Sequence, residues 1–317
     1  KVKVYNFNRD RARNSIHDIV NYLRKEKPNY FISLLDYMNI ISSIAHKICN
    51  SQSKLILWEH SHLTTHSKKT ISRFQFLNKI LIYLTYSRAE KIIAVSEGIG
   101  EDLIRNFNLP EKTVKVIENA VFSKNIIEDS KKNHRELLNF KNKYIVSIGR
   151  LVKEKNYLNL ISAYKVLKDS NKVNGYDLII VGDGPEKHTL MDFIKANKLE
   201  DCVRLVGFMI NPYPWIKHAS VFVLSSDNEG LPTVLIEALA LKKQIVSTDC
   251  PSGPNEILDN GKYGVLVQKN NPLELAKGIY CIISKKIIFA EHNLIKRAKY
   301  YSIDNSFEKF ITLLGLD

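Results

Sequence analysis

Residues 222–240 read Phe-Val-Leu-Ser-Ser-Asp-Asn-Glu-Gly-Leu-Pro-Thr-Val-Leu-Ile-Glu-Ala-Leu-Ala, an apolar strand joined to a helix by a Glu-Gly-Leu-Pro turn. Gly230 lets the backbone turn sharply, and Pro232 suits the first turn of a helix, where an amide hydrogen would be unpaired. The N-terminus of such a helix offers free N–H groups and a partial positive charge. The turn formed by Glu229, Gly230, Leu231 and Pro232 therefore predicts a binding site for a diphosphate.

The second glutamate of this stretch, Glu237, lies roughly 8 Å beyond Pro232 along the helix axis, at about 1.5 Å per residue. This is about the reach from a bound diphosphate to the ribose hydroxyls of the same nucleotide, and a carboxylate accepts both hydroxyl protons. The alternative is an amphipathic helix on which Glu229 and Glu237 are solvated charges. Apolar residues on both sides of Glu237 argue against full exposure.

Short apolar runs alternate with helix-like stretches along the whole chain, which predicts an α/β protein with parallel sheets. The expected strands are Val2–Phe7, Tyr30–Leu35, Leu55–Trp58, Ile92–Val95 and Val114–Ile117, then Tyr144–Ile148, Leu178–Val181, Val203–Leu205, Val221–Leu224, Gln244–Ser247 and Gly264–Val267. We expect two Rossmann-like domains that face a cleft, 1–142 and 143–317, divided in the polar stretch Ser123–Lys143. After Pro272 the chain is predicted to be helical, with a last helix that is capped at Ser302 or Asp304 and packs back on the first domain.

The composition narrows the class of protein. A chain of 317 residues with 44% hydrophobic content can bury two cores. Its four cysteines are widely spaced without a Cys-x-x-Cys pair, which argues against a disulfide framework or zinc site and favours the reducing cytoplasm. No run approaches the roughly 18 apolar residues of a spanning helix. We therefore expect a cytoplasmic protein whose contact with the inner face of the membrane is peripheral.

The net charge of +14 is concentrated in the first half, where residues 1–142 hold 24 Lys and Arg against 14 Asp and Glu. Segment 67–91 interleaves basic residues with apolar ones, a mixture suited to anionic lipid headgroups. The alternative is a core helix with a solvated basic face. Nucleic acid also attracts such charge, but the ordered motifs below do not fit that role, and we expect no nucleic-acid partner. The basic residues of the segment are Lys68, Lys69, Arg73, Lys79, Arg88 and Lys91.

Further motifs follow the strands of the second half. Gly149, Arg150 and Lys155 come after the first of them, and ligands of open α/β sheets bind beyond the carboxyl ends of strands. An arginine fork and a lysine point charge suit two phosphoryl groups, although both can also be solvated surface charges. Val181-Gly-Asp-Gly-Pro185 is a weak dinucleotide fingerprint, because Lys187 stands where a third glycine is required.

Five motifs in order resemble glycosyltransferase family 4, a family of retaining enzymes with the GT-B fold. The resemblance covers nearly all of the second domain and implies transfer of a hexose or N-acetylhexosamine from a UDP-sugar to a lipid-linked or polysaccharide acceptor. The stretch 249–258 is most similar to members that build the O-antigen of lipopolysaccharide, capsule or lipid-linked oligosaccharides. The motifs are Gly149-Arg150…Lys155, Val181-Gly-Asp-Gly-Pro185, Gly207-Phe208, Glu229-Gly-Leu-Pro…Glu237 and Ser252-Gly-Pro-Asn-Glu256.

The resemblance also implies roles for single residues. Arg150 and Lys155 would bind the donor diphosphate beside Gly149. Glu229 would contact the transferred sugar, next to the donor-binding turn Gly230, Leu231 and Pro232. Glu237 would hold the ribose, and Gly207, Phe208 and Met209 would border the base. In the first domain, Leu55–His62 resembles the family's strand end with a histidine, so that His60 would face the sugar; His62 and His66 are close competitors. Ser96 is expected to cap the helix that lines the cleft. No metal or other cofactor is implied, since the two cations stabilise the leaving diphosphate.

Family members open with a strand and a glycine-rich loop, whereas the first glycine here is Gly98. We therefore expect a first domain that is incomplete at its N-terminus, with an uncovered sheet edge. Two other functions stay open. One is a donor-binding but inactive fragment. The other is a nucleotide-sugar epimerase of the same fold, for which the first domain offers no identifiable acid and base.

Overall fold

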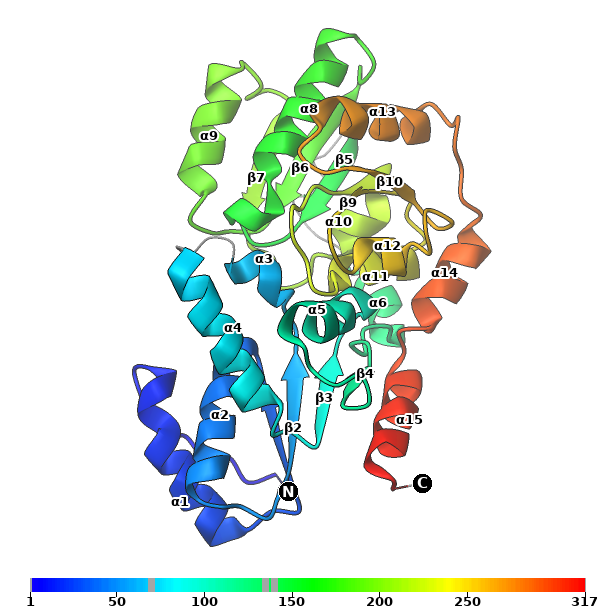
Figure 1. Ribbon diagram of the computed structural model, residues 1–317. Coiled ribbons are helices and arrows are strands. Elements are labelled where there is room, and N and C mark those ends of the chain that lie inside the picture. The colour runs from blue at the N-terminus through cyan, green and yellow to red at the C-terminus, as the bar shows by residue number, and fades with distance from the viewer. Residues whose placement is uncertain (1, 68–71, 133–136, 138–141, 317) are drawn as a thin grey trace. The chain divides into compact units, whose positions relative to one another are not determined.

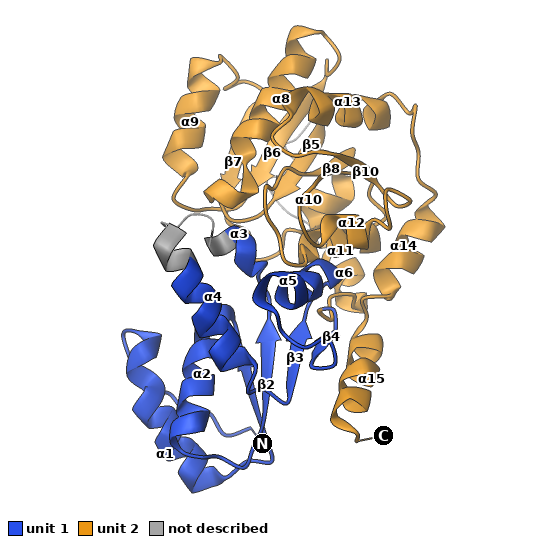
Figure 2. Ribbon diagram, in the orientation of Figure 1, with its two compact units in different colours: residues 1–118 blue, residues 119–317 orange. Residues whose placement is uncertain are grey.

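The computed structural model describes residues 2–67, 72–132, 137 and 142–316, which form two compact units, Lys1–Glu118 and Asn119–Asp317 (Figures 1 and 2). This division falls earlier in the chain than the predicted boundary after Asn142. The difference arises from α6 (Lys124–Asp129), which packs against α10 (Tyr213–His218) and α11 (Thr233–Ala240) of the second unit. Its end is fixed by Asn211, whose Nδ2 donates to the carbonyl oxygen of Asp129 at 2.9 Å.

The first unit holds a four-stranded parallel sheet of order β1-β2-β3-β4. Helices connect consecutive strands, as parallel pairing requires, so the carboxyl ends of all four strands meet at one edge. The strands are β1 (Tyr30–Leu34), β2 (Lys54–Glu59), β3 (Lys91–Ala94) and β4 (Val114–Val116). The helices are η1 (Ala12–Ser15), α1 (Ile16–Glu26), α2 (Asp36–Ile48), α3 (Leu63–Ser67), α4 (Ser72–Tyr86) and α5 (Glu97–Phe107).

The helices of this unit follow their sequence signals. The α1 residues Ile19, Val20 and Leu23 recur on one face and pack on Ile41 and Ala45 of α2. At the start of α5, the predicted cap is confirmed, because the Ser96 hydroxyl accepts a hydrogen bond from the amide of Ile99 at 3.4 Å.

The predicted strand Val2–Phe7 is wrong. This segment is irregular, and Val2 and Val4 are 92% and 87% exposed. A strand needs a ladder partner, and within the described residues β1 pairs with β2 alone, so the first strand edge of the sheet is uncovered. The segment packs on α1 instead, since the Tyr5 hydroxyl donates to Glu26 at 3.0 Å and its ring meets Tyr22 edge-on.

The second unit holds a six-stranded parallel sheet of order β10-β9-β8-β5-β6-β7. This is the doubly wound Rossmann order, in which the strand order reverses between β5 and β8. Ligands of such sheets bind beyond the carboxyl ends of the strands at this switch point. The strands are β5 (Lys143–Ile148), β6 (Tyr176–Val181), β7 (Val203–Gly207), β8 (Val221–Leu224), β9 (Ile245–Asp249) and β10 (Val265–Gln268). The helices besides α6, α10 and α11 are η2 (Lys153–Lys155), α8 (Tyr157–Asp169), α9 (Lys187–Ala196), α12 (Pro254–Ile257), α13 (Pro272–Ile283), α14 (Glu291–Lys299) and α15 (Ile303–Leu314).

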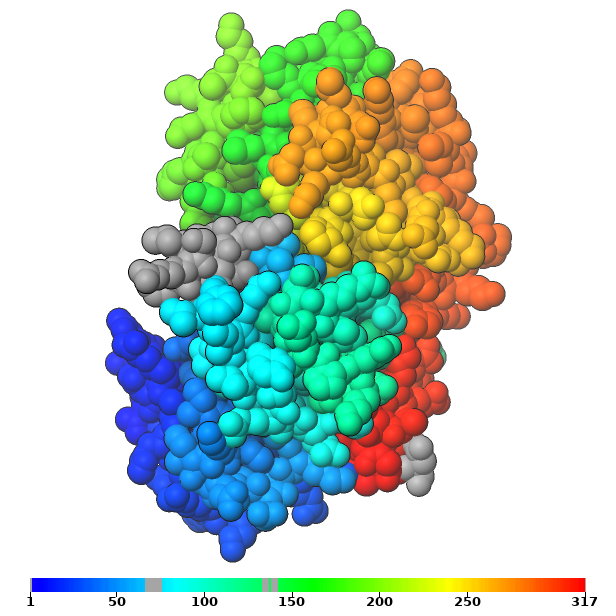
Figure 3. All heavy atoms as spheres, viewed as in Figure 1, coloured from blue at the N-terminus to red at the C-terminus, as the bar shows by residue number. Residues whose placement is uncertain are grey.

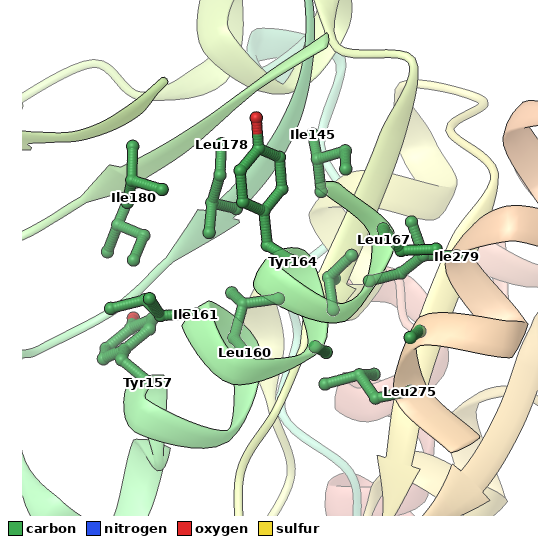
Figure 4. Packing of buried hydrophobic residues seen from close by; sticks show 14 of the residues in the cluster. Ile145, Tyr157, Leu160, Ile161, Tyr164, Leu167, Leu178, Ile180, Leu275 and Ile279 are labelled. Carbon is green, nitrogen blue, oxygen red and sulfur yellow. The ribbon is translucent and has the colours of Figure 1, made fainter. Parts of the chain in front are cut away.

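The core of this unit lies where α8 and α13 pack against each other and against the sheet. Figure 4 shows Tyr164 of α8 beside Leu178 of β6, and Leu167 of α8 beside Ile279 of α13; all four side chains are buried. The strand β8 is buried at every position, which fits a sheet covered on both faces. Such strands read as continuous apolar runs, and this explains why the sequence predicts them well.

The region after Pro272 is helical, as the sequence predicts, and consists of α13, α14 and the separate last helix α15. The cap of α15 is Ser302 and not Asp304, because the Ser302 hydroxyl accepts from the amide of Asn305 at 3.3 Å. Among the residues that the structure describes, no helix has the length and apolar character needed to cross a membrane.

Candidate functional site

Two of the predicted site residues are in direct contact at the switch point of the second sheet. Lys155 ends the loop after β5, Glu229 lies in the loop after β8, and Lys155 Nζ donates to Glu229 Oε1 at 2.5 Å. Their side chains are 19% and 11% exposed. Lys155 therefore lies at the carboxyl edge of this sheet, where the sequence predicts it, and Glu229 lies beside it.

Serine hydroxyls hold this ion pair in place. Ser226 Oγ donates to Glu229 Oε1 at 2.6 Å, and Ser225 Oγ donates to the carbonyl oxygen of Lys155 at 2.9 Å. From the loop after β9, Ser252 Oγ donates to the carbonyl oxygen of Glu229 at 2.6 Å. Three serine hydroxyls therefore hold the ion pair: one bonds the Glu229 carboxylate and two bond the backbone carbonyls of Lys155 and Glu229. The sequence gives no motif that selects these serines, although Ser225 and Ser226 directly follow a buried strand.

Asn156 ties the loop of Lys155 to two further loops. Its backbone is left-handed, with φ of 45°, and its side-chain oxygen accepts from the amide of Asn159 to cap α8. Its Nδ2 donates to both carboxylate oxygens of Asp227, at 2.9 and 3.1 Å, and to Asn270 Oδ1 at 2.7 Å. Asparagine tolerates this conformation better than most residues. The side chain of Asn156 therefore joins three loops, a contact between distant segments that the local sequence does not reveal.

The Gly-Asp-Gly-Pro segment after β6 supports the same loop. Gly182 and Gly184 have φ of 146° and 158°, and a Cβ on Gly182 would overlap the carbonyl oxygen of Gly149. A Cβ on Gly184 would approach the Leu151 carbonyl oxygen at 2.5 Å. The two glycines therefore let one strand-end loop pass directly against the next. Pro185 lies just before α9, whose first residue is Lys187.

The other residues predicted to bind the donor lie in the loop after β5 or at the end of β7. Arg150 is exposed, and within the described residues its side chain makes no hydrogen bond or ion pair. Gly207 ends β7 with φ of 80°, followed by Phe208, which is 72% exposed, and the half-buried Met209. An exposed phenylalanine at a strand end is available to a flat ligand such as a base.

The helix α11 begins where the sequence predicts. Pro232 is its N-cap, Leu231 and Pro232 are buried, and a Cβ on Gly253 would overlap the Pro232 ring, so the loop after β9 packs on the Glu-Gly-Leu-Pro turn. Glu237 is mostly buried, and burial raises the pKa of its carboxyl to about 7. The alternative in which Glu237 is a solvated surface charge is therefore wrong.

In the first unit, His60 directly follows β2. Its half-buried ring stacks on Trp58, with centroids 6.2 Å apart, and its Nε2 is buried without a hydrogen-bond partner among the described residues. Burial lowers the pKa of His60, so the imidazole is neutral at pH 7. Its competitor His62 lies 3.3 Å from the buried carboxylate of Asp102, a contact that ties the loop to α5. The side chain of His66 lies outside the described residues.

The helix α4 carries an apolar outer surface, which we call the α4 face. The exposed apolar residues are Phe76, Leu77, Ile80, Leu81, Tyr83 and Leu84, while Ile82 and Tyr86 are buried. The helix, cyan in Figure 3, forms part of the surface of the first unit, and Lys79 and Arg88 are exposed beside its apolar residues. The alternative given by the sequence, a core helix with a solvated basic face, does not account for the apolar residues exposed on α4. Lys68 and Lys69, and the side chain of Arg73, lie outside the described residues.

Two parallel sheets, the second of Rossmann order with a lysine, serines and glycine turns at its switch point, define a nucleotide-binding α/β class of protein. Residues 129–301 match the family described as Glycosyl transferases group 1, and residues 5–122 match Glycosyltransferase Family 4. The chain belongs to the group 1 glycosyl transferases.

Individual relatives agree with this. The chain is 37% identical over 203 residues to N-acetylgalactosamine-N,N'-diacetylbacillosaminyl-diphospho-undecaprenol 4-alpha-N-acetylgalactosaminyltransferase of Campylobacter jejuni, which covers 64% of this chain and 53% of the relative. It is 31% identical over 279 residues to an uncharacterized glycosyltransferase of Methanocaldococcus jannaschii, over 80% of this chain and 66% of that one. The chain thus spans between half and two thirds of the length of these two curated relatives.

The fold is that of solved GT-B proteins. The structure of Anabaena HepE in complex with UDP-glucose superposes with a TM-score of 0.78 at 20% sequence identity, covering 95% of this chain and 81% of HepE. The predicted GT-B fold is therefore confirmed, with one parallel sheet in each of two units.

Proposed function

We propose that this protein is a retaining glycosyltransferase that moves a hexose or N-acetylhexosamine from a UDP-sugar to a lipid-linked or polysaccharide acceptor. The observation that carries the proposal is the Lys155–Glu229 contact at the switch point of the second sheet. An ammonium group has three donors, and Glu229 engages one of them, which leaves others for phosphate oxygens. A donor diphosphate bound there would have its sugar next to Glu229.

The other residues of the second unit complete this donor site. Arg150 is exposed and unpaired within the described residues, so its guanidinium is available as a second cation for the diphosphate. Glu237, whose carboxyl is poorly solvated, gains hydrogen-bond donors when ribose hydroxyls reach it. Phe208 and Met209 offer an apolar border for uracil.

In the proposed reaction, the bond between C1 of the sugar and the diphosphate oxygen breaks while the acceptor oxygen attacks C1 from the same face. The hydroxyl proton of the acceptor moves to an oxygen of the leaving diphosphate, so the anomeric configuration is retained. Arg150 and Lys155 stabilise the charge that develops on that diphosphate. The neutral imidazole of His60 hydrogen-bonds a sugar hydroxyl. This scheme needs no metal, and we expect turnover to persist in excess EDTA.

The acceptor proposal rests on the Campylobacter relative, whose name specifies a diphospho-undecaprenol substrate. A protein that acts on such lipids works at a membrane surface. The α4 face offers apolar residues beside Lys79 and Arg88, which suits peripheral contact with anionic headgroups. Co-sedimentation with vesicles containing phosphatidylglycerol tests this: binding should weaken in a Leu77→Glu, Leu84→Glu variant and in high salt, and unchanged binding would contradict it.

The test of the reaction is release of UDP from UDP-hexoses and UDP-N-acetylhexosamines, measured with and without undecaprenyl-diphosphate-linked saccharides. Release that depends on acceptor supports a transferase. Interconversion of the UDP-sugars without acceptor would identify an epimerase, and UDP binding without any turnover would identify a donor-binding but inactive chain. Either of these last results would overturn the proposal.

A further inference from the structure

A fully buried hydrogen-bond network lies beneath His60. Glu59, the last residue of β2, is 0% exposed. Its Oε1 accepts from the backbone amides of His60 and Ser61, both at 3.0 Å, and its Oε2 accepts from the Tyr86 hydroxyl at 2.6 Å. A glutamate at the end of an apolar strand normally reaches solvent. Here the carboxylate turns back and fixes the two residues that follow it.

The network extends to the neighbouring strands. Asn39 of α2, also 0% exposed, donates from Nδ2 to the Tyr86 hydroxyl at 3.2 Å and to the carbonyl oxygen of Trp58 at 3.1 Å. The same carbonyl accepts from the amide of Leu35, a non-glycine residue with φ of 75° at the end of β1. Strained backbone of this kind persists where its surroundings enforce it.

On the other side of β2, the amide of Val95 at the end of β3 donates to the carbonyl oxygen of Glu59 at 3.2 Å. The network therefore joins the carboxyl ends of β1, β2 and β3, the edge at which ligands of parallel sheets bind.

The geometry points to Glu59 as the positioning residue for His60: its buried carboxylate fixes the backbone that presents the imidazole at the edge of the first sheet, and Tyr86 and Asn39 fix the carboxylate. This inference rests on the proposed function, in which His60 contacts the donor sugar. Trp58, stacked on the imidazole, holds the ring from a second direction.

The protonation of Glu59 modulates this arrangement. Burial raises the pKa of its carboxyl to about 7, and the nearby charge of Asp36 acts in the same direction, while the hydrogen bonds from Tyr86, Ser61 and His60 act against it. Burial and Glu59 raise the pKa of Tyr86, so its hydroxyl keeps its proton and donates. An ionised Glu59 accepts from all three donors, whereas a protonated one has less acceptor capacity. The loop of His60 is therefore held most firmly above pH 7.

The direct test is the pH titration of the backbone amide ¹⁵N shifts of His60 and Ser61 in the full chain, from pH 5 to 9. The wild type should show an inflection near pH 7 at both amides. Glu59→Gln should abolish that inflection, and the control Glu90→Gln, at an exposed position, should keep it. If the inflection persists in Glu59→Gln, another group causes it and the inference is wrong.

The functional test separates positioning from folding. Glu59→Gln and Tyr86→Phe should lower kcat for sugar transfer by about 10- to 100-fold, the scale of a small misplacement of a reacting group. The KM for the UDP-sugar should change by less than about twofold, because Lys155 and Arg150 bind the diphosphate. Tyr37→Phe, at an exposed tyrosine of α2, is the matched control and should behave as wild type. Folded variants with full kcat would overturn the inference.

A double-mutant cycle shows whether Glu59 acts through His60. In a His60→Ala background, Glu59→Gln should cost at most a few-fold more, since the group it positions is gone. Equal losses in both backgrounds would contradict the inference. Calorimetric titration with UDP keeps the two claims apart. Failure of the wild type to bind UDP would remove the proposed function, and the amide titration would still decide whether Glu59 holds the loop.

Discussion

In the second unit, the loops after β5 and β8 are joined by the partly exposed ion pair of Lys155 and Glu229. In the first unit, by contrast, the fully buried side chains of Glu59, Asn39 and Tyr86 hold the backbone at the end of β2. Both networks lie at the carboxyl edge of a parallel sheet. A partly exposed ion pair keeps charge available to a ligand. In a buried network the polar atoms hydrogen-bond one another and fix the adjacent backbone. We therefore expect the second unit to bind an anion through Lys155 and the first unit to hold His60 in a fixed position.

The largest effect expected from this contrast is on turnover. Lys155→Ala should lower sugar transfer by about 10²- to 10³-fold, the cost of removing one preorganised charge from a transition state. Lys153→Ala, an exposed neighbour in the same loop, is the control and should leave transfer near the wild-type rate. If the two variants behave alike, the position of Lys155 at the strand end has no special role.

Stability should suffer most where loops of the second unit pass each other. Gly182→Ala places a Cβ against the Gly149 carbonyl and should cost about 3 kcal/mol or more. Gly175→Ala, at a φ of 77° with no atom near its Cβ, should cost only about 1 kcal/mol. Urea unfolding followed by Trp215 fluorescence, in a Trp58→Phe background, reports the second unit alone. Equal costs at both positions would contradict the close approach of the loops.

The two buried glutamates should give both units the same dependence on pH. Burial raises the carboxyl pKa of Glu59 and Glu237 from 4.5 to about 7, so between these values the native state keeps a proton that the unfolded chain has lost. Stability is therefore greater at pH 5 and falls as the pH rises through 7. As the pH rises from 5 to 8, the free energy of unfolding of either Glu→Gln variant should gain about 1 to 3 kcal/mol relative to that of the parent.

Urea unfolding at the two pH values measures this effect. Trp58→Phe isolates the second unit for Glu237→Gln, and Trp215→Phe isolates the first unit for Glu59→Gln. Parent and variant curves that shift in parallel with pH would show that these carboxyls titrate normally.

The smallest effect is expected for an ion pair outside the strand ends. Lys165 and Asp169 form an i,i+4 pair on α8 at 2.9 Å, with side chains 38% and 61% exposed. Lys165→Ala should change the free energy of unfolding by less than about 0.5 kcal/mol. A loss comparable to that of Gly182→Ala would mean that ion pairs support this unit generally, which would weaken the contrast drawn for Lys155.

The sequence predicted the second sheet because its strands are buried on both faces and read as continuous apolar runs. Val2–Phe7 alternates apolar and polar residues as a strand can, but among the described residues no strand pairs with it, and a local pattern does not contain that information. The division between the units was misplaced for a related reason. The polar segment around α6 looks like a linker, yet it packs on α10 and α11, which lie far along the chain.

The candidate site shows the same limit. Lys155, Glu229 and Glu237 stand in short motifs with glycine and proline, so local sequence was enough to select them. Glu59 gave no such signal, because its burial depends on Tyr86, 27 residues away in the chain, and on Asn39. Long-range hydrogen bonds of this kind become visible only in the folded structure.

The most direct test of the central claim, that the switch point of the second sheet binds the donor diphosphate, is calorimetric titration of the chain with UDP. We expect the wild type and Lys153→Ala to bind UDP with the same affinity and Lys155→Ala to bind about 10-fold or more weakly, the scale of a lost charge-assisted hydrogen bond. Equal affinity of Lys155→Ala and wild type, or no binding by the wild type, would contradict the account.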